Sequence, residues 1–382
     1  MMAPRLVFWL SLALLAYTYA GYPLTALLLG RLVRRRVAKA ACEPAVTIVI
    51  AAHNEASHLR ATIENKLGLD YPRGQLQLVI VSDGSTDGID AIAQAFASQS
   101  VVVLRQDPRR GKTAALNLGV THATGDVLVF ADANSSYAPD ALRALVRNFA
   151  DPQVGYATGR MVYEDREASG VGLGCRAYMA YEDLLRRSET RLGSIVGVNG
   201  GIDAVRRSLY VDMRDDQLPD FVLPLAVVDR GYRVVYEPDA ILREEALSTG
   251  TGEYRMRVRV ALRAWWTLKD MRRLFDVRRN GVFALQLFSH KALRYLMFVA
   301  VPACYGSALA LSTTHVVYGL AAAGGTLVLL LAAAGFVIDR RGRSAWPCSI
   351  PYYFLLINAA SAHALCEFLR GRRRTLWTPR LG

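Results

Sequence analysis

The chain has 382 residues, 52% of them hydrophobic, and its 46 lysines and arginines against 33 acidic residues give a formal net charge of +13. This length predicts two or three domains, and hydrophobicity combined with positive charge favours a membrane protein whose basic segments face an anionic leaflet. A nucleic-acid-binding protein is disfavoured because the arginine runs mostly flank apolar segments. The five cysteines have no close spacing, which indicates neither a zinc site nor a disulfide framework.

The amino-terminal segment 6–30 carries no charged residue and is long enough to cross a bilayer. Only Arg5 precedes this segment. Five basic residues follow it: Arg31, Arg34, Arg35, Arg36 and Lys39. The positive-inside rule therefore predicts an external amino terminus and a cytoplasmic continuation. A cleaved signal peptide ending near Ala20 is the alternative, but the apolar run continues past Ala20 into a basic flank typical of a stop-transfer segment.

Four apolar or β-branched runs, at 46–50, 76–81, 101–104 and 127–131, predict strands, and helical stretches separate them. This alternation predicts a parallel sheet with right-handed crossovers. Polar clusters follow the first, second and fourth strands, at the edge where open α/β sheets bind nucleotides. Neither a G-x-G-x-x-G nor a G-x-x-x-x-G-K-[ST] motif is present, so we predict nucleotide binding by carboxylates and a metal ion instead of a glycine loop.

The fourth of these strands ends in Asp132-Ala133-Asn134. Residues i and i+2 at a strand end point the same way, so two oxygen ligands lie side by side. Hard divalent cations take such ligands and share them with substrate phosphates, which makes Asp132 and Asn134 candidate metal ligands. A strand that simply ends in a polar turn is the alternative that this stretch alone leaves open.

Four motifs in order make the chain similar to a known family: Ala-x-Asn-Glu ending at Glu55, Ser-Asp-Gly-Ser-Thr-Asp at 82–87, Gly-Lys at 111–112 and Asp-Ala-Asn at 132–134. Together they resemble the inverting family 2 glycosyltransferases, in the membrane-integrated subgroup of hyaluronan, poly-N-acetylglucosamine and cellulose synthases. The similarity runs from about Val46 to Glu245. It implies an α/β fold of the GT-A (Rossmann-like) type, in a cytoplasmic domain with α-helical transmembrane segments at both ends.

The resemblance implies a role for each motif residue. Glu55 and Asp83 would hold the uridine of a UDP-sugar, and Lys112 would lie near the base or the phosphates. Asp132 and Asn134 would stand at the family's D-x-D motif, with Mg²⁺ or Mn²⁺ on the diphosphate. The chain departs from that motif at Asn134, whose amide oxygen carries no net charge, so metal binding there is expected to be weaker or indirect.

Segment 218–225 matches the family's Asp-Asp-Phe or Glu-Asp stretch, with Pro219 in place of one acid, and this makes Asp220 the predicted general base. The chemistry requires a base, since an acceptor hydroxyl is a very weak acid and must lose its proton as it attacks. A helix N-cap is the alternative role for Asp220. Asp215 and Asp216 are the alternative bases.

Segment 253–275 has apolar residues every three to four positions with arginines between them, which predicts an amphipathic basic helix at a membrane surface. The family's synthases carry a Gln-x-x-Arg-Trp motif in this region. The chain offers an imperfect match in Arg263 and Trp265, and the resemblance implies that both cap the donor pocket.

Three further apolar stretches close the chain and predict membrane spans, at about 295–311, 317–338 and 350–368. If all three span, the basic groups 340–343 and 370–374 lie on opposite sides of the membrane, against the positive-inside rule. A re-entrant or interfacial segment removes the conflict, and Pro347 and Pro351 make the last stretch the expected exception.

We therefore predict four regions: a transmembrane helix with a basic flank (1–40), a GT-A domain (41–250), amphipathic interface helices (251–293) and a transmembrane bundle (294–382). The predicted enzyme is a hexosyl- or N-acetylhexosaminyltransferase of the inner (plasma) membrane. It would move a sugar from a UDP-sugar to a growing glycan in exopolysaccharide or capsule-type synthesis.

The expected partners are the UDP-sugar donor, a glycan or lipid-linked acceptor and membrane lipids, with no nucleic acid. A polyprenyl-phosphate sugar transferase with the same donor chemistry is the alternative enzyme. A channel or transporter component with a degenerate nucleotide domain is the non-enzymatic alternative, which the presence of Asp83, Asp132 and Asp220 together disfavours.

Overall fold

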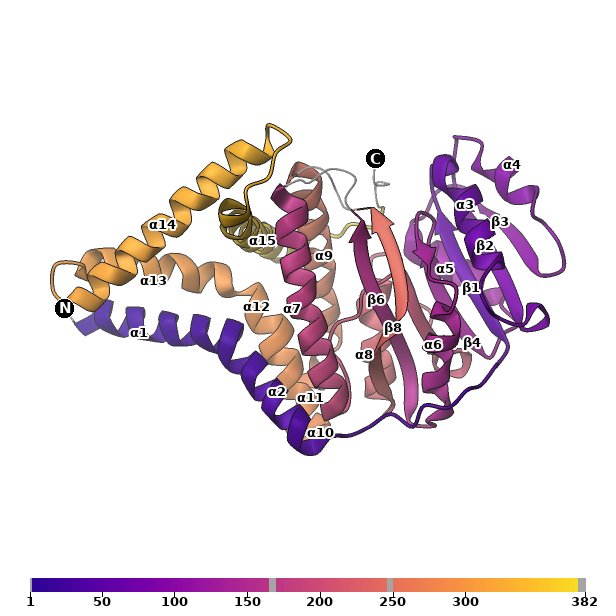
Figure 1. Cartoon of the computed structure of the whole chain (residues 1–382), viewed down its shortest axis with the longest axis horizontal. Helices are drawn as coiled ribbons and strands as arrows, with labels where there is room; N and C mark the ends of the chain where they lie inside the picture. The colour runs from indigo at the N-terminus through magenta and orange to yellow at the C-terminus, as the bar shows by residue number, and fades with distance from the viewer. Residues whose placement is uncertain (1, 165–169, 246–249, 377–382) are drawn as a thin grey trace.

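An α/β domain with one long sheet carries a group of helices that come from both ends of the chain and extend away from it (Figure 1). The computed structural model describes residues 2–164, 170–245 and 250–376. Two long helices, α7 (Gly170–Leu192) and α9 (Gly250–Asp270), stand between the sheet and the outer helices (Figure 1).

The sheet has eight strands in the order β3-β2-β1-β4-β7-β6-β8-β5. Its parallel half consists of β1 (Val46–Ala52), β2 (Leu76–Asp83), β3 (Val101–Gln106) and β4 (Val127–Asp132). These are the four strands that the sequence predicts, so the parallel half-sheet is confirmed. The strands are continuous apolar runs because helices cover both of their faces.

The second half of the sheet begins at β7 (Ile202–Arg206), which runs antiparallel to β4. β6 (Val154–Glu164) pairs with β7 and with β8 (Arg233–Glu245), and the short β5 (Ser136–Tyr137) lies at the edge. Because β4 and β7 run in opposite directions, the end of β4 and the start of β7 share one edge of the sheet.

Two apolar layers hold helices against the sheet. Ile48 belongs to the layer under α3 (Ala56–Leu67), α4 (Ile89–Gln94) and α6 (Ala141–Val146). Val49 belongs to the layer under α5 (Lys112–Thr121) and α8 (Pro219–Asp229). The two neighbours lie in different layers because successive side chains of a strand point to opposite faces.

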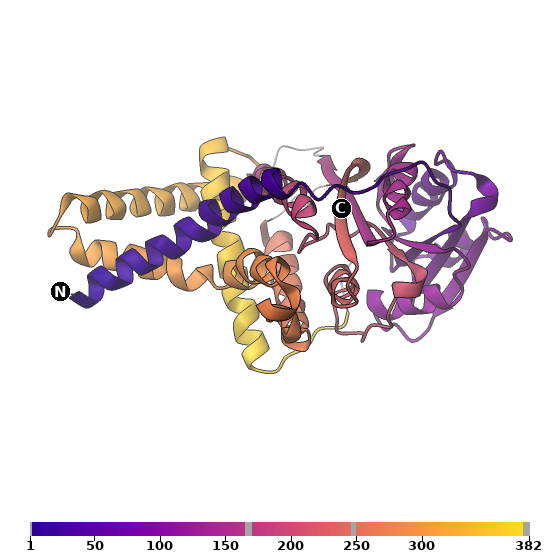
Figure 2. The same ribbon diagram turned by 90° about the horizontal axis from the view of Figure 1, so that it is seen from below.

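The outer helices are apolar and extend away from the α/β domain. α1 (Met2–Ala16), a π-helical turn (Tyr17–Gly21) and α2 (Tyr22–Val33) follow one another directly. α13 (Met297–Leu311) lies beside α1, and α14 (Val316–Asp339) meets α1 near its own start and then diverges from it (Figures 1 and 2). Met2–Val33 and Val316–Asp339 are long and apolar enough to cross a membrane. The bent pair Val282–Tyr295 and Met297–Leu311 is a third candidate if it counts as one span.

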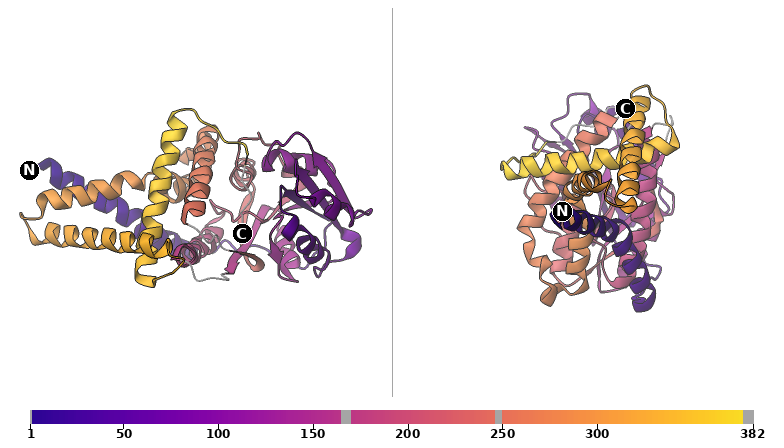
Figure 3. Two further views of the ribbon diagram at one scale, coloured as in Figure 1. Left: turned by 90° about the horizontal axis from the view of Figure 1, so that it is seen from above. Right: turned by 90° about the vertical axis from the view of Figure 1, so that its left-hand side faces the viewer.

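The last apolar stretch forms α15 (Trp346–Leu369), which differs from these candidates. It lies across the direction of α1, α13 and α14 instead of alongside them (Figures 2 and 3). An interfacial α15 leaves the basic groups 340–343 and 370–374 on the same side of a membrane. This arrangement supports the last stretch as the exception to the spanning pattern.

The helix predicted for the membrane surface is α9, and its position at a membrane surface stays a prediction. Its apolar residues Val258, Leu262 and Trp266 pack against Ala360 and Ala364 of α15, so protein covers the apolar stripe. Short helices connect α9 to α13: α10 (Val277–Asn280), α11 (Val282–Gln286), a π-helical turn (Leu287–Ala292) and α12 (Leu293–Tyr295).

The loop between α13 and α14 lies at the end of the helices farthest from the α/β domain (Figure 1). We expect a reporter fused after Lys39 to be cytoplasmic and one inserted at Thr314 to be external, because the basic flank follows the first apolar helix. Paired alkaline phosphatase and fluorescent-protein fusions at both positions measure this. An external signal at position 39 would contradict the topology.

Candidate functional site

A cavity of about 300 Å³ opens at the carboxyl ends of β1 and β4. The start of α8 and parts of α7 and α9 complete its walls. Six of the eight residues predicted for the site line it: Glu55, Lys112, Asp132, Asn134, Asp220 and Arg263. A wider and more open hollow of about 810 Å³, near Cys42 and Arg206, contains none of the predicted residues.

Asp132 ends β4 and forms an ion pair with Lys112, the first residue of α5. Gly111 precedes Lys112 with a φ of 103°, a backbone conformation that glycine adopts readily. Burial lowers the pKa of Lys112, but the carboxylates of Asp132 and Asp220 outweigh this effect and raise the pKa above its usual value. Lys112 is therefore a fixed positive charge in the cavity, suited to stabilising an anion.

Asp83 is fully buried and holds the loop that leads to Lys112. Its Oδ1 accepts hydrogen bonds from Gln106 Nε2 at 2.6 Å and Arg110 N at 2.9 Å, and its Oδ2 accepts one from Gly111 N at 2.9 Å. Asp83 does not line the cavity among the described residues. The contact of Asp83 with a uridine stays a prediction. Its hydrogen bonds to the Arg110 and Gly111 amides hold the backbone that positions Lys112.

Asp220 lies in the first turn of α8 and faces the cavity. The residue before this helix is Leu218, and no side chain caps the helix start, so the N-cap alternative for Asp220 is excluded. Its Oδ1 is buried and has no hydrogen-bond partner among the described residues. Burial raises the pKa of Asp220, while nearby Lys112 opposes the rise. A buried carboxyl of raised pKa is suited to accept a proton.

The alternative bases point to other partners. Asp216 Oδ1 lies 3.1 Å from Arg214 Nε, and its Oδ2 pairs with Arg373. Asp215 Oδ2 lies 3.2 Å from Arg110 Nη2. Within the described part of the chain, Asp220 alone of the three lines the cavity.

Two glycines keep the carboxylates of Asp220 and Asp132 open to one ligand. Gly200 and Gly201 have φ values of 71° and 73°. A Cβ on Gly200 would lie 2.9 Å from Asp220 Oδ2, and a Cβ on Gly201 would lie 3.2 Å from Asp132 Oδ2. Any larger residue would therefore press on one of the two carboxylates.

Asn134 also lines the cavity, and its Nδ2 donates a hydrogen bond to Glu244 Oε1 at 3.4 Å. The sequence analysis missed Glu244, which reaches the site from the irregularly paired β8, and its only sequence signal is the acidic pair at 244–245. Among the described residues, no group of three or more His, Cys, Asp or Glu side chains is placed to hold a metal ion. A cation at Asp132 and Asn134 would therefore need further oxygens from its ligand.

Asp203 on β7 is a second acidic residue that sequence reasoning missed. It lines the cavity and its side chain is 2% exposed. Burial raises the pKa of Asp203 to about 7, with the Thr158 hydroxyl opposing the rise and Asp220 adding to it. The sequence signal is an acidic residue inside the otherwise mostly apolar strand Ile202–Arg206. Such a residue also occurs in strands where it has only a structural role.

Arg263 and Trp265, the imperfect Arg-Trp match, separate in the structure. Arg263 lines the cavity, and its guanidinium donates hydrogen bonds to the carbonyl oxygens of Arg374, at 2.8 Å, and Thr375. Burial and the neighbouring Arg259 lower its pKa to about 10. The carboxy-terminal segment thus lies beside the cavity.

Trp265 packs outside the cavity lining. Its ring lies 5.9 Å from the ring of Tyr295 and 6.1 Å from that of Phe368, measured between centroids. A capping role over the donor pocket stays a prediction for Arg263, and this geometry does not favour it for Trp265.

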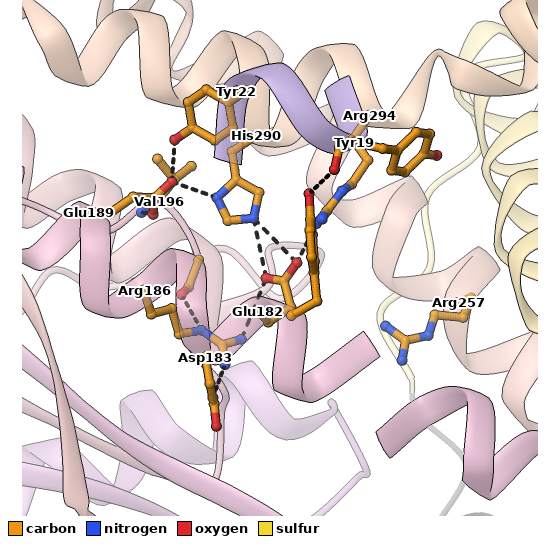
Figure 4. A network of polar contacts seen from close by, with 12 residues as sticks. Tyr19, Tyr22, Glu182, Asp183, Arg186, Glu189, Val196, Arg257, His290 and Arg294 are labelled. Atoms are coloured by element: carbon orange, nitrogen blue, oxygen red, sulfur yellow. Dashed lines mark hydrogen bonds and ion pairs between the residues drawn. The ribbon is translucent and has the colours of Figure 1, made fainter. Parts of the chain in front are cut away.

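A buried ionic network beside the cavity joins α7 to the outer helices (Figure 4). Glu189 Oε1 lies 2.7 Å from His290 Nδ1 and accepts a hydrogen bond from Tyr22. Glu182 Oε2 lies 3.2 Å from His290 Nε2, and Oε1 pairs with Arg294. Burial opposes the charge on Glu182, but Arg294 and His290 hold its pKa well below the usual range. Such pairing is what makes buried charges tolerable.

Comparisons with known proteins bear on the α/β domain that carries this site. Residues 47–211 match the family described as Glycosyl transferase family 2, and this match supports a family 2 glycosyltransferase. Poly-beta-1,6-N-acetyl-D-glucosamine synthase of Staphylococcus aureus is 25% identical over 266 residues. The probable glycosyltransferase YdaM of Bacillus subtilis is 26% identical over 275 residues. Both matches cover 68% of this chain and 64% of the relative, slightly under two thirds of its length.

One solved structure matches nearly the whole chain. The mannosyltransferase PcManGT from Pyrobaculum calidifontis, in complex with GDP-Man and Mn²⁺, superposes with a TM-score of 0.71. The match covers 96% of this chain and 99% of that protein at 22% identity. This likeness confirms the GT-A fold of the α/β domain. Because it covers 96% of the chain, it also includes the helices outside that domain.

Replacing Asp83 with Ala tests the positioning role of its carboxylate. We expect faster hydrogen exchange at the Arg110 and Gly111 amides and a loss of stability on the order of 3 kcal/mol, because two buried amides lose a charged acceptor. Hydrogen-exchange mass spectrometry and thermal unfolding measure these effects. Asp87→Ala serves as the control, because this exposed residue lies in the loop after β2 and its carboxylate accepts from the Ala56 amide instead of from Arg110 or Gly111. Unchanged exchange in Asp83→Ala would contradict the role.

Proposed function

We propose that the protein is a membrane-bound inverting glycosyltransferase that moves a sugar from a UDP-sugar to a growing glycan, in exopolysaccharide or capsule-type synthesis. One observation carries the proposal: the carboxylate of Asp220, whose buried Oδ1 has no hydrogen-bond partner in the described part of the chain, lies with the Asp132–Lys112 ion pair around two adjacent glycines. The similarity to poly-beta-1,6-N-acetyl-D-glucosamine synthase supports an N-acetylhexosamine as the transferred sugar and disfavours the polyprenyl-phosphate alternative.

The site supplies what a single displacement needs. Asp220 takes the proton of an acceptor hydroxyl as its oxygen attacks the anomeric carbon of the donor. Lys112 provides positive charge near the departing diphosphate. Attack and departure on opposite faces of the sugar invert the anomeric centre, and no enzyme nucleophile is required.

The oxygen atoms of Asp132 and Asn134 fit a hard divalent cation that completes its coordination with donor phosphates. Glu244, hydrogen-bonded to Asn134, adds a third oxygen donor close by. When bound, Mg²⁺ or Mn²⁺ would neutralise charge on the diphosphate.

The proposed location is the inner membrane, with the α/β domain in the cytoplasm where nucleotide sugars are made. The candidate spans and the basic flank after the first helix support this orientation. The acceptor is then met at the membrane surface, between α7, α9 and the bent helix pair.

Incubation of purified membranes with a panel of radiolabelled nucleotide sugars tests the function. We expect incorporation of label from one UDP-sugar into a glycan, with UDP-N-acetylglucosamine the first to examine. Membranes that carry Asp220→Asn provide the background. No incorporation and no release of UDP from any donor in the panel would refute the proposal.

Asp220→Asn should lower the rate of transfer by about 10²- to 10⁴-fold, the range for loss of a general base. Binding of the donor should survive, because the amide keeps the size of the side chain. Asp229→Asn, at the far end of the same helix, is the matched control and should stay near wild-type activity. A substantial residual rate in Asp220→Asn would place the base elsewhere.

Activity should require Mg²⁺ or Mn²⁺ and disappear with EDTA, because the Asp132 carboxylate repels a diphosphate unless a divalent cation lies between them. Asn134→Asp should tighten Mn²⁺ binding while it preserves transfer. Metal titrations of both proteins, read from activity and from Mn²⁺ binding, measure this. Full activity in EDTA would exclude the metal assignment.

A further inference from the structure

Several buried oxygen atoms line the cavity, and three of them have no hydrogen-bond partner among the described residues: Asp203 Oδ1, Asn199 Oδ1 and Asp220 Oδ1. Buried polar atoms without partners are rare and costly in folded proteins, so each calls for an explanation. Asp220 has one in the acceptor hydroxyl that it is proposed to deprotonate. The proposed displacement gives no role to Asp203 or Asn199.

Both residues are held rigidly toward the cavity. Asn199 Nδ2 donates to Gly159 O at 2.6 Å and its backbone N donates to Thr158 Oγ1 at 3.3 Å, which fixes the amide and leaves Oδ1 as the remaining acceptor. Asp203 lies on β7 inside the sheet, where it pairs with Phe130 of β4 on one side and with Thr158 of β6 on the other.

The chemistry of these oxygens limits what can satisfy them. The amide oxygen of Asn199 only accepts hydrogen bonds, and Asp203 does the same in its ionised form, so a ligand that satisfies both must donate. A diphosphate offers acceptor oxygens and does not meet this need. The hydroxyl groups of a sugar do.

The position of Asp203 indicates that these hydroxyl groups belong to the transferred sugar. The charged groups that act on its pKa are Asp220, Lys112 and Asp132, that is, the proposed base and the pair proposed to face the diphosphate, and all of them line the same cavity. In a single displacement, the ring of the transferred sugar lies between the attacking hydroxyl and the leaving diphosphate. Asp203 therefore lies where that ring must be held.

We infer that Asp203 and Asn199 form the subsite that binds hydroxyl groups of the transferred sugar, and so determine which UDP-sugar the enzyme accepts. This inference rests on the proposed function. A site built to accept hydrogen bonds from a hydroxyl discriminates strongly against a substrate that lacks it, because the buried acceptor is then left without a partner.

The test compares binding of UDP with binding of the UDP-sugar that the wild-type enzyme turns over, by calorimetry on the full-length protein. Asp203→Ala should weaken UDP-sugar binding by about 10-fold or more, the size expected for one charge-assisted hydrogen bond, and leave UDP binding unchanged. Asp203→Asn should fall between, since its amide oxygen still accepts. Asn199→Ala should change the ratio in the same direction.

Asp151→Asn is the matched control, because it makes the same change in a buried carboxylate that pairs with Arg233 away from the cavity. Loss of stability alone should leave its ratio of UDP-sugar to UDP affinity unchanged. A set of donors, each lacking one hydroxyl, adds a second readout. Wild type should discriminate against one or more of them, and Asp203→Ala should lose that discrimination.

An unchanged affinity ratio in both Asp203→Ala and Asp203→Asn would overturn the inference. A parallel loss of UDP and UDP-sugar binding would also overturn it, by assigning Asp203 to the diphosphate or to its cation. Failure of the proposed function is distinguishable, since the wild-type protein would then transfer no sugar from any UDP-sugar.

Discussion

The concentration of carboxylates in one cavity is the constraint on which the rest of the site depends. Asp132, Asp203 and Asp220 line the same cavity, Asp203 is buried, and neighbouring like charges repel one another. Lys112 offsets part of this charge, and Asp83 keeps Lys112 in place through the Gly111 backbone. The glycines between Asp132 and Asp220 preserve the space that a sugar nucleotide would fill. The repulsion between these carboxylates destabilises the empty site, and a bound ligand with its cation would relieve it.

The network around Glu182 extends this arrangement to the outer helices. His290 and Arg294 belong to the bent helix pair, Tyr22 to the first apolar helix, and Glu182 to the cavity wall (Figure 4). Replacing one partner would leave another charge buried and uncompensated, so the outer helices and the α/β domain are expected to hold a fixed relative position. A fixed position would suit the proposed enzyme, whose acceptor would arrive at the membrane surface.

Local pattern predicted the parallel half-sheet and most of the site. Asp132 and Asn134 follow a strand directly, and Asp220 stands in a recognisable motif, so each could be found without knowing the fold. Asp203 and Glu244 could not, because they reach the cavity through pairing between strands that are distant in sequence. The burial of α9 also depends on a distant partner, α15. Spacing alone cannot distinguish an apolar stripe covered by lipid from one covered by protein.

The central claim is a single displacement at the anomeric carbon with Asp220 as base and no covalent sugar–enzyme intermediate. The configuration of the new glycosidic bond tests it most directly. With an α-configured UDP-sugar as donor, the anomeric proton of the product can be read by NMR. The account predicts a β-linked product, formed by inversion. An α-linked product would require retention and would contradict it.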